Sequence, residues 1–182
     1  MLQNNFLIIL RSNLTPKKKA AIFQGTSTAM NVNFINVHVL NSTVSSSSAY
    51  AGGFLATASG CVFRNCTLQN TCVMGSVAGG FAANFASGSR TGVMDNCFNL
   101  GFQDASQKIV ISTTGTNDVG GLVGMLTSGN ITNSGVFSGQ ITSVRGNAGG
   151  IAGCAGSSSF ISSVFVRPQV NVIGKYAGGK KT

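Results

Sequence analysis

Few side chains in this sequence can do acid–base or nucleophilic chemistry. The 182 residues include three acids, Asp95, Asp104 and Asp118, together with one histidine, His38, and five cysteines. Cleavage of a glycan on a β-fold requires paired carboxylates, or a metal-binding acidic cluster with a base nearby. Asp104 and Asp118 with Arg90 are the combination closest to such a site, and solvated turn residues are the simpler interpretation. The sequence therefore predicts no catalytic residue and no cofactor.

The cysteines do not have the spacing of a metal site. No C-x-x-C pair occurs among them, and His38 is distant in sequence from all five, so we expect no bound zinc. Their odd number excludes a complete set of intramolecular disulfides. The cysteines are Cys61, Cys66, Cys72, Cys97 and Cys154.

The formal net charge of +9 is concentrated at the two ends of the chain. Between residues 21 and 174 five basic and three acidic residues leave a net charge of only +2. A nucleic-acid surface needs a basic stripe along one face, so the sequence predicts no nucleic-acid partner. The basic residues near the ends are Arg11, Lys17, Lys18, Lys19, Lys175, Lys180 and Lys181.

The apolar run from Phe6 to Leu10 is too short to span a membrane, which takes about 20 residues. We expect residues 1–20 to form a basic segment or a capping strand. Residues 21–182 are expected to form one repeat domain.

The chain contains an internal repeat, which we expect to form the strands that carry the residues described above. Gly-Gly pairs recur at steps of 27, 41, 29 and 29 residues, and repeats of this length indicate a solenoid, propeller or array. The pairs are Gly52-Gly53, Gly79-Gly80, Gly120-Gly121, Gly149-Gly150 and Gly178-Gly179.

Other positions come into register when the first glycine of each pair is counted as zero. Position 11 is apolar in Phe63, Ile131 and Phe160, and position 13 is small and polar in Asn65, Asn133 and Ser162. Four extra residues in the 41-residue unit bring Met94 and Asn96 into the same two sets, and a degenerate unit from Phe23 adds Phe34 and Asn36. Position 2 is also apolar (Phe54, Phe81, Leu122, Ile151), and position 4 is small (Ala56, Ala83, Gly124, Gly153).

This pattern predicts an all-β fold, a parallel β-helix of about five coils with a repeat near 29 residues. Each unit is expected to hold two or three short strands, as in 121–126 and 131–137, joined by Gly-, Ser- and Asn-rich turns with no helical crossover. Equivalent residues then stack about 4.8 Å apart, which gives apolar columns inside and an asparagine ladder at position 13. The open ends invite end-to-end self-association, and the terminal lysines are expected to oppose it.

Cys66 and Cys97 occupy the same position in adjacent units. At a stacking distance of about 5 Å they are able to form a disulfide, or to fill space as a buried pair of thiols. Both alternatives remain open from sequence.

The segment Gly120-Gly121-Leu122-Val123-Gly124 resembles the GLUG repeat, named for its Gly-Leu-unspecified-Gly core. Asn-Ser at 133–134 and Asn-Cys at 65–66 and 96–97 are similar to a later step of that motif. The resemblance implies a non-enzymatic spacer or adhesin stalk, extracellular or at the cell surface, with glycans or proteins of a host or cell surface as possible partners. Two alternatives are a carbohydrate-binding or carbohydrate-cleaving β-helix and an ice-binding solenoid. The second would need a regular threonine array, which Thr67, Thr113 and Thr132 do not provide.

Overall fold

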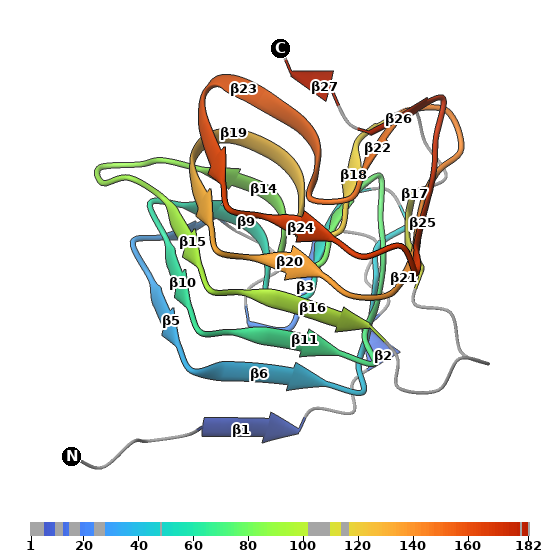
Figure 1. Cartoon of the computed structure of the whole chain (residues 1–182). Coiled ribbons are helices and arrows are strands. Elements are labelled where there is room, and N and C mark those ends of the chain that lie inside the picture. Colours follow the sequence, from blue (N-terminus) through green and yellow to red (C-terminus); the bar gives the residue numbers. More distant parts are fainter. Residues whose placement is uncertain are drawn as a thin grey trace.

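The computed structural model describes residues 6–9, 13–14, 19–23, 28–47, 49–101, 110–113, 117–178 and 180–181. Every strand pairing in this part of the chain is parallel, and the chain winds as a β-solenoid of about five coils with a repeat of about 30 residues. Figure 1 shows successive coils stacked from the blue N-terminal strand to the red C-terminal strands. The predicted fold class is confirmed.

Four parallel sheets run along the stack. Sheet 1 contains β1 (Phe6–Ile9), β6 (Val37–Leu40), β11 (Thr67–Gln69), β16 (Phe98–Gly101), β20 (Gly135–Val136) and β24 (Phe165–Val166). Sheet 2 contains β2 (Asn13–Leu14), β7 (Thr43–Ser45), β12 (Cys72–Met74), β17 (Val110–Thr113), β21 (Gly139–Ser143) and β25 (Val170–Ile173).

The other two sheets complete each coil. Sheet 3 contains β3 (Ala20–Ala21), β8 (Tyr50–Gly52), β13 (Val77–Gly79), β18 (Val119–Gly120), β22 (Asn147–Gly149) and β26 (Tyr176–Ala177). Sheet 4 contains β4 (Ala29–Met30), β5 (Asn33–Ile35), β9 (Leu55–Ser59), β10 (Val62–Arg64), β14 (Ala82–Ala86), β15 (Val93–Asp95), β19 (Val123–Thr132), β23 (Ala152–Ser162) and β27 (Lys180–Lys181). The proposed boundary between residues 20 and 21 falls inside β3.

The coils contain more strands than the two or three predicted. The coil from Tyr50 to Met74 has five, because residues with positive φ at Gly60, Asn65 and Asn70 interrupt the strands at its corners. The turn predicted at Ser128-Gly129 is absent, because β19 continues unbroken through both residues.

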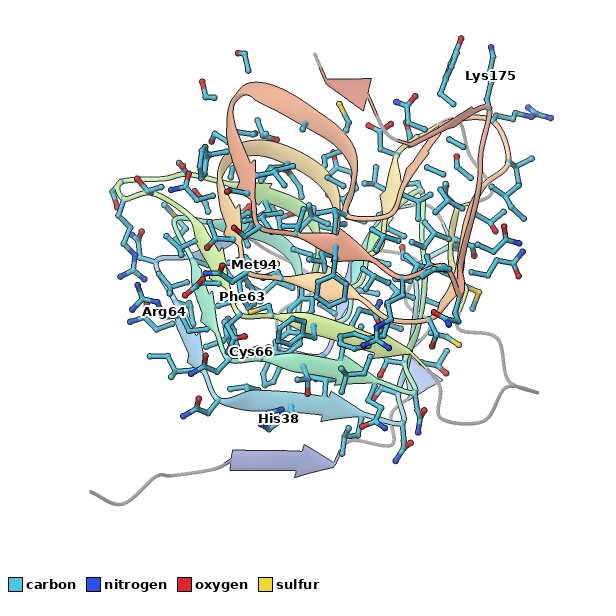
Figure 2. All side chains as sticks on the ribbon, viewed as in Figure 1. His38, Phe63, Arg64, Cys66, Met94 and Lys175 are labelled. Carbon is cyan, nitrogen blue, oxygen red and sulfur yellow. The ribbon has the colours of Figure 1, made fainter. Side chains whose placement is uncertain are left out.

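The predicted apolar columns form the centre of the core. Phe63 lies in register with Phe34 on one side and Met94 on the other, and Met94 lies in register with Ile131. The second column is joined by backbone hydrogen bonds from Phe54 to Phe81, Leu122 and Ile151 in turn. Figure 2 places Phe63 and Met94 within the coils and Lys175 at the periphery.

One register prediction is wrong in the last coil. Ile131 pairs with Ile161 and Thr132 with Ser162, so Ile161 and Ser163 take the places predicted for Phe160 and Ser162. The register of β19 and β23 shifts between Leu126 and Ser128, where β23 has one extra residue. The shift explains why Phe160 is 56% exposed.

The glycine pairs lie where backbones of neighbouring coils approach closely. A Cβ built on Gly53 would be 2.2 Å from the carbonyl oxygen of Gly80, and one on Gly80 would be 2.3 Å from that of Gly121. A Cβ on Gly121 would be 2.1 Å from the carbonyl oxygen of Gly150. The repeat of glycine therefore reflects a steric requirement of coil stacking.

The part of the chain that the structure describes has no helix long and apolar enough to cross a membrane.

Candidate functional site

An asparagine corner lies where sheet 4 turns into sheet 1. Asn36, Asn65, Asn96 and Asn133 all have left-handed backbones, with φ of 56°, 53°, 53° and 48°. Asparagine adopts this conformation more readily than most other residues with a side chain. Ser163 continues the corner with φ of 53°. The predicted small polar set therefore turns the chain at each coil.

Side-chain amides connect the asparagine corner from coil to coil. Asn65 Nδ2 donates to Asn36 Oδ1 at 3.1 Å, and Asn96 Nδ2 donates to Asn65 Oδ1 at 2.8 Å. The predicted ladder departs from this pattern at Asn133, whose Nδ2 donates instead to Asp95 Oδ1 at 2.9 Å.

A second asparagine ladder was not predicted. Asn41 and Asn70 have φ of 51° and 49°, and Asn70 Nδ2 donates to Asn41 Oδ1 at 3.0 Å. Both lie at the turn from sheet 1 into sheet 2. Their spacing of 29 residues, equal to the repeat, was the signal available in the sequence.

The groups considered for catalysis are not brought together. Asp95 lies in sheet 4, whereas Asp118 precedes β18 of sheet 3 and accepts a hydrogen bond from Asn147. Arg90 donates to the carbonyl oxygens of Gly60 and Asn31 at 2.7 and 2.6 Å, which ties the inserted segment to the preceding coil. Asp104 lies outside the described residues. Among the residues that the structure describes, no group of three His, Cys, Asp or Glu side chains could hold a metal ion.

His38 lies on sheet 1, where its Nδ1 is 2.7 Å from Thr67 Oγ1 on the next strand. This polar contact links coils on the outer side of the sheet.

Cys66 and Cys97 lie at equivalent positions of adjacent coils, as the pairings Arg64 with Asp95 and Thr67 with Phe98 require. Both are fully buried thiols in the structure. Burial raises the pKa of the Cys97 thiol far above its ordinary value. The thiol alternative is therefore the one present in the structure.

An aromatic cluster on sheet 1 was also missed. Phe137 lies 5.9 Å from Phe98 and 5.1 Å from Phe165 between ring centroids. Arg167 lies over the Phe137 ring at 4.5 Å, an attractive cation–π arrangement. Gly135 leaves space for the Phe165 ring, because a Cβ there would be 2.7 Å from it. Phe165 remains 39% exposed.

No family model matches the sequence, and no curated protein does. Among solved structures, the chain is similar to "a putative immunoglobulin A1 protease from Bacteroides ovatus", with a TM-score of 0.64 and 13% sequence identity. The match covers 98% of this chain and 67% of that chain. At this identity the likeness shows the β-solenoid fold alone.

Replacing Asn65 by Ala is expected to lower the free energy of unfolding by about 2 kcal/mol, because alanine is strained at positive φ and cannot form the ladder bonds. Asn65→Gly, which tolerates this backbone, is expected to lose less than about 1 kcal/mol. Urea denaturation measures both, with Asn171→Ala, an exposed change in β25, as control. Equal stability of all three variants would show that the asparagine corner contributes nothing.

The pKa of Asp95 is lowered by the hydrogen bonds that it accepts from Asn133 and Thr132. Asp95 therefore stabilises the fold fully above its unfolded pKa of about 3.9, and this stabilisation is lost as pH falls through the lower folded pKa. We expect the melting temperature of the wild type to fall more between about pH 4 and pH 2 than that of Asp95→Asn. Parallel pH profiles would contradict the assignment.

Thiol alkylation is expected to distinguish Cys66 and Cys97 from the half-buried Cys72. Because the reagent cannot reach a fully buried sulfur, Cys66 and Cys97 should react with iodoacetamide only after unfolding, and Cys72 should react in the folded protein. Peptide mapping by mass spectrometry without reductant measures this. Recovery of a peptide linked through Cys66 and Cys97 would support the disulfide alternative instead.

Proposed function

We propose that this chain is a non-enzymatic structural segment of a secreted or cell-surface protein, where it serves as a spacer or adhesin stalk. The observation that carries the proposal is the unbroken stacking of the coils. Apolar columns and backbone ladders continue from one coil to the next, so in the described residues each coil pairs with its neighbours through all four sheets, and amide hydrogen bonds join Asn36, Asn65 and Asn96 at one corner. Such a stack transmits force and holds a fixed length.

The resemblance of Gly120 to Gly124 to the GLUG repeat supports the same proposal, since that repeat occurs in large surface-attached chains. The cellular site is tested by labelling intact producing cells with an amine reagent that cannot cross membranes. Lys175 is exposed and should be modified. Modification of Lys175 only after lysis would contradict a surface location.

The spacer role is tested within the surface protein that carries this segment. Exchange of the segment for an unrelated β-solenoid with the same number of coils should leave adhesion unchanged. Deletion of two coils should weaken adhesion, because the adhesive part is then held closer to the cell. Loss of adhesion on exchange would mean that the surface of this segment itself binds the partner.

Glycan binding is a second candidate, and the aromatic cluster of Phe98, Phe137 and Phe165 favours it. Exposed rings stack on sugar faces, and Arg167 adds a hydrogen-bond donor beside them. Titration of the protein with oligosaccharides, followed by NMR, tests this candidate. Shifts confined to the aromatic cluster and abolished in Phe165→Ala support glycan binding, and an absence of shifts at millimolar sugar rejects it.

A further inference from the structure

The chain contains sequons, Asn-x-Ser/Thr patterns whose asparagine can accept an N-linked glycan in a secreted protein. Four of them begin at Asn13, Asn41, Asn65 and Asn130, and each has threonine at its third position. A sequon offers two polar groups, the asparagine Nδ2 that takes the sugar and the hydroxyl two residues later. The structure describes both groups in the last three sequons, and the fold uses them differently.

The sequon of Asn65 is part of the coil-to-coil contacts. Asn65 Nδ2 donates to Asn36 Oδ1 at 3.1 Å, and Asn65 Oδ1 accepts from Asn96 Nδ2 at 2.8 Å. The Thr67 hydroxyl lies 2.7 Å from His38 Nδ1 on the neighbouring strand. Both groups of this sequon therefore already join coils, and a sugar on Asn65 would disrupt the asparagine corner.

The sequon of Asn130 is engaged as well. Asn130 is half-buried within β19, with Val93 and Phe160 in register on its two sides at the strand spacing of about 4.8 Å. The Thr132 hydroxyl donates to Asp95 Oδ1 at 2.8 Å. A glycan on Asn130 would crowd both neighbouring side chains, and the hydroxyl of its sequon is already bonded.

The sequon of Asn41 has both groups unused. Asn41 is exposed at the turn from sheet 1 into sheet 2, and its Oδ1 accepts from Asn70 Nδ2 at 3.0 Å. Because this bond directs the amide oxygen toward the next coil, Nδ2 faces away from Asn70. Thr43 lies on the outer face of β7, since the side chains alternate and Val44 is buried. Within the described residues, neither Asn41 Nδ2 nor Thr43 Oγ1 forms a hydrogen bond.

The local backbone holds Asn41 at the outside of this turn. Its φ is 51°, and its backbone N–H donates to the Gln69 carbonyl oxygen at 3.1 Å. The buried Ser42 that follows donates its hydroxyl to the Leu40 carbonyl oxygen at 2.9 Å. A bulky substituent on Asn41 Nδ2 therefore leaves the core and the strand ladders intact.

We propose that Asn41 is the site of an N-linked glycan. The co-reactant is a lipid-linked sugar diphosphate. A bond forms between Asn41 Nδ2 and the anomeric carbon of the first sugar, and the bond from that carbon to the diphosphate oxygen breaks. The lipid diphosphate leaves, and Nδ2 gives up one proton to a base of the transferase. Asn41 Oδ1 is unchanged, so the hydrogen bond from Asn70 is retained. The inference rests on the proposed secretion or surface location of the protein.

Site mapping of the protein purified from its producing cells tests the proposal. Peptide N-glycosidase converts a glycosylated asparagine into aspartate, and in heavy-oxygen water the new carboxylate carries the isotope. Mass spectrometry should find this label at Asn41 and at neither Asn65 nor Asn130. An Asn41 without label overturns the proposal. Label spread equally over all three overturns it too, because the fold would then select none of them.

Variants of the same sequon provide matched controls. Asn41→Asp removes the acceptor nitrogen but keeps an oxygen for the Asn70 amide, and aspartate accepts a left-handed backbone much as asparagine does. Thr43→Val removes the hydroxyl and Thr43→Ser keeps it. The glycan should be lost completely in Asn41→Asp and in Thr43→Val and kept in Thr43→Ser, with circular dichroism confirming that the strands are retained. Sugar that persists on Asn41 in Thr43→Val would contradict recognition of the sequon.

Amine labelling of Lys175 on the same intact cells separates this inference from the proposed location. Lys175 modified on intact cells, together with an Asn41 that carries no sugar, overturns the glycosylation alone. Lys175 protected until lysis, together with an Asn41 that carries no sugar, overturns both the surface location and the glycosylation that rests on it.

Discussion

Replacing Phe63 by Asp is expected to unfold the solenoid at room temperature. The Phe63 ring is fully buried and stacks on Phe34 at 5.0 Å, while the rings of Phe54 and Phe81 meet it edge-on at 5.7 and 6.0 Å. A carboxylate there loses these contacts and stays uncompensated in an apolar column. The cost should exceed about 5 kcal/mol, which reaches the total stability of many domains.

The neighbouring position provides a matched control for Phe63. Val62 precedes Phe63 in β10 and, because side chains alternate along a strand, its side chain points to the outer face of sheet 4. Val62→Asp should keep the β-sheet circular dichroism signal and a cooperative melt, whereas Phe63→Asp should show neither. A folded Phe63→Asp protein would mean that the inner and outer faces are interchanged.

The sequence contained enough information for the fold because each coil repeats the same contacts. Three kinds of position recur at the repeat spacing: apolar residues such as Phe63, left-handed corners such as Asn65, and glycines at close approaches such as Gly80. Each has a separate physical cause, namely burial, backbone conformation and backbone-to-backbone distance. Agreement among three independent requirements identifies a stacked coil more securely than any one of them.

Two of the missed features, the extra residue of β23 and the aromatic cluster, do not recur at a fixed spacing. One extra residue in β23 moved Ile161 into the place predicted for Phe160, because a single insertion reverses which side chains face inward. The aromatic cluster around Phe137 depends on Gly135 and on three strands whose outer faces carry different residues. Phe98, Gly135 and Phe165 are in register, but the middle position is glycine and the ring between them comes from Phe137, two residues later, so no aromatic residue recurs from coil to coil.

Gly121→Ala is expected to destabilise the fold by about 3 kcal/mol, the upper part of the range for overpacking a close-packed core. The added methyl would lie 2.1 Å from the carbonyl oxygen of Gly150 and 2.7 Å from Val136 Cγ2. The first neighbour is backbone of the next coil, held by the hydrogen bond from Gly121 to Gly149, so it cannot move without separating the coils. Denaturation in guanidinium chloride measures the loss.

Gly88→Ala is the matched control for Gly121→Ala. Gly88 is exposed, and its added methyl would lie 2.6 Å from the Ser59 hydroxyl, which can rotate away, and no nearer than 3.3 Å to the backbone atoms of Ser59 and Gly60. We expect this variant to stay within about 0.5 kcal/mol of the wild type. If both variants were equally stable, the spacing of the coils at Gly121 would be able to relax, and the recurrence of Gly-Gly pairs would need a cause other than close backbone approach. If only Gly121→Ala is destabilised, that recurrence is a direct record of where one coil rests on the next.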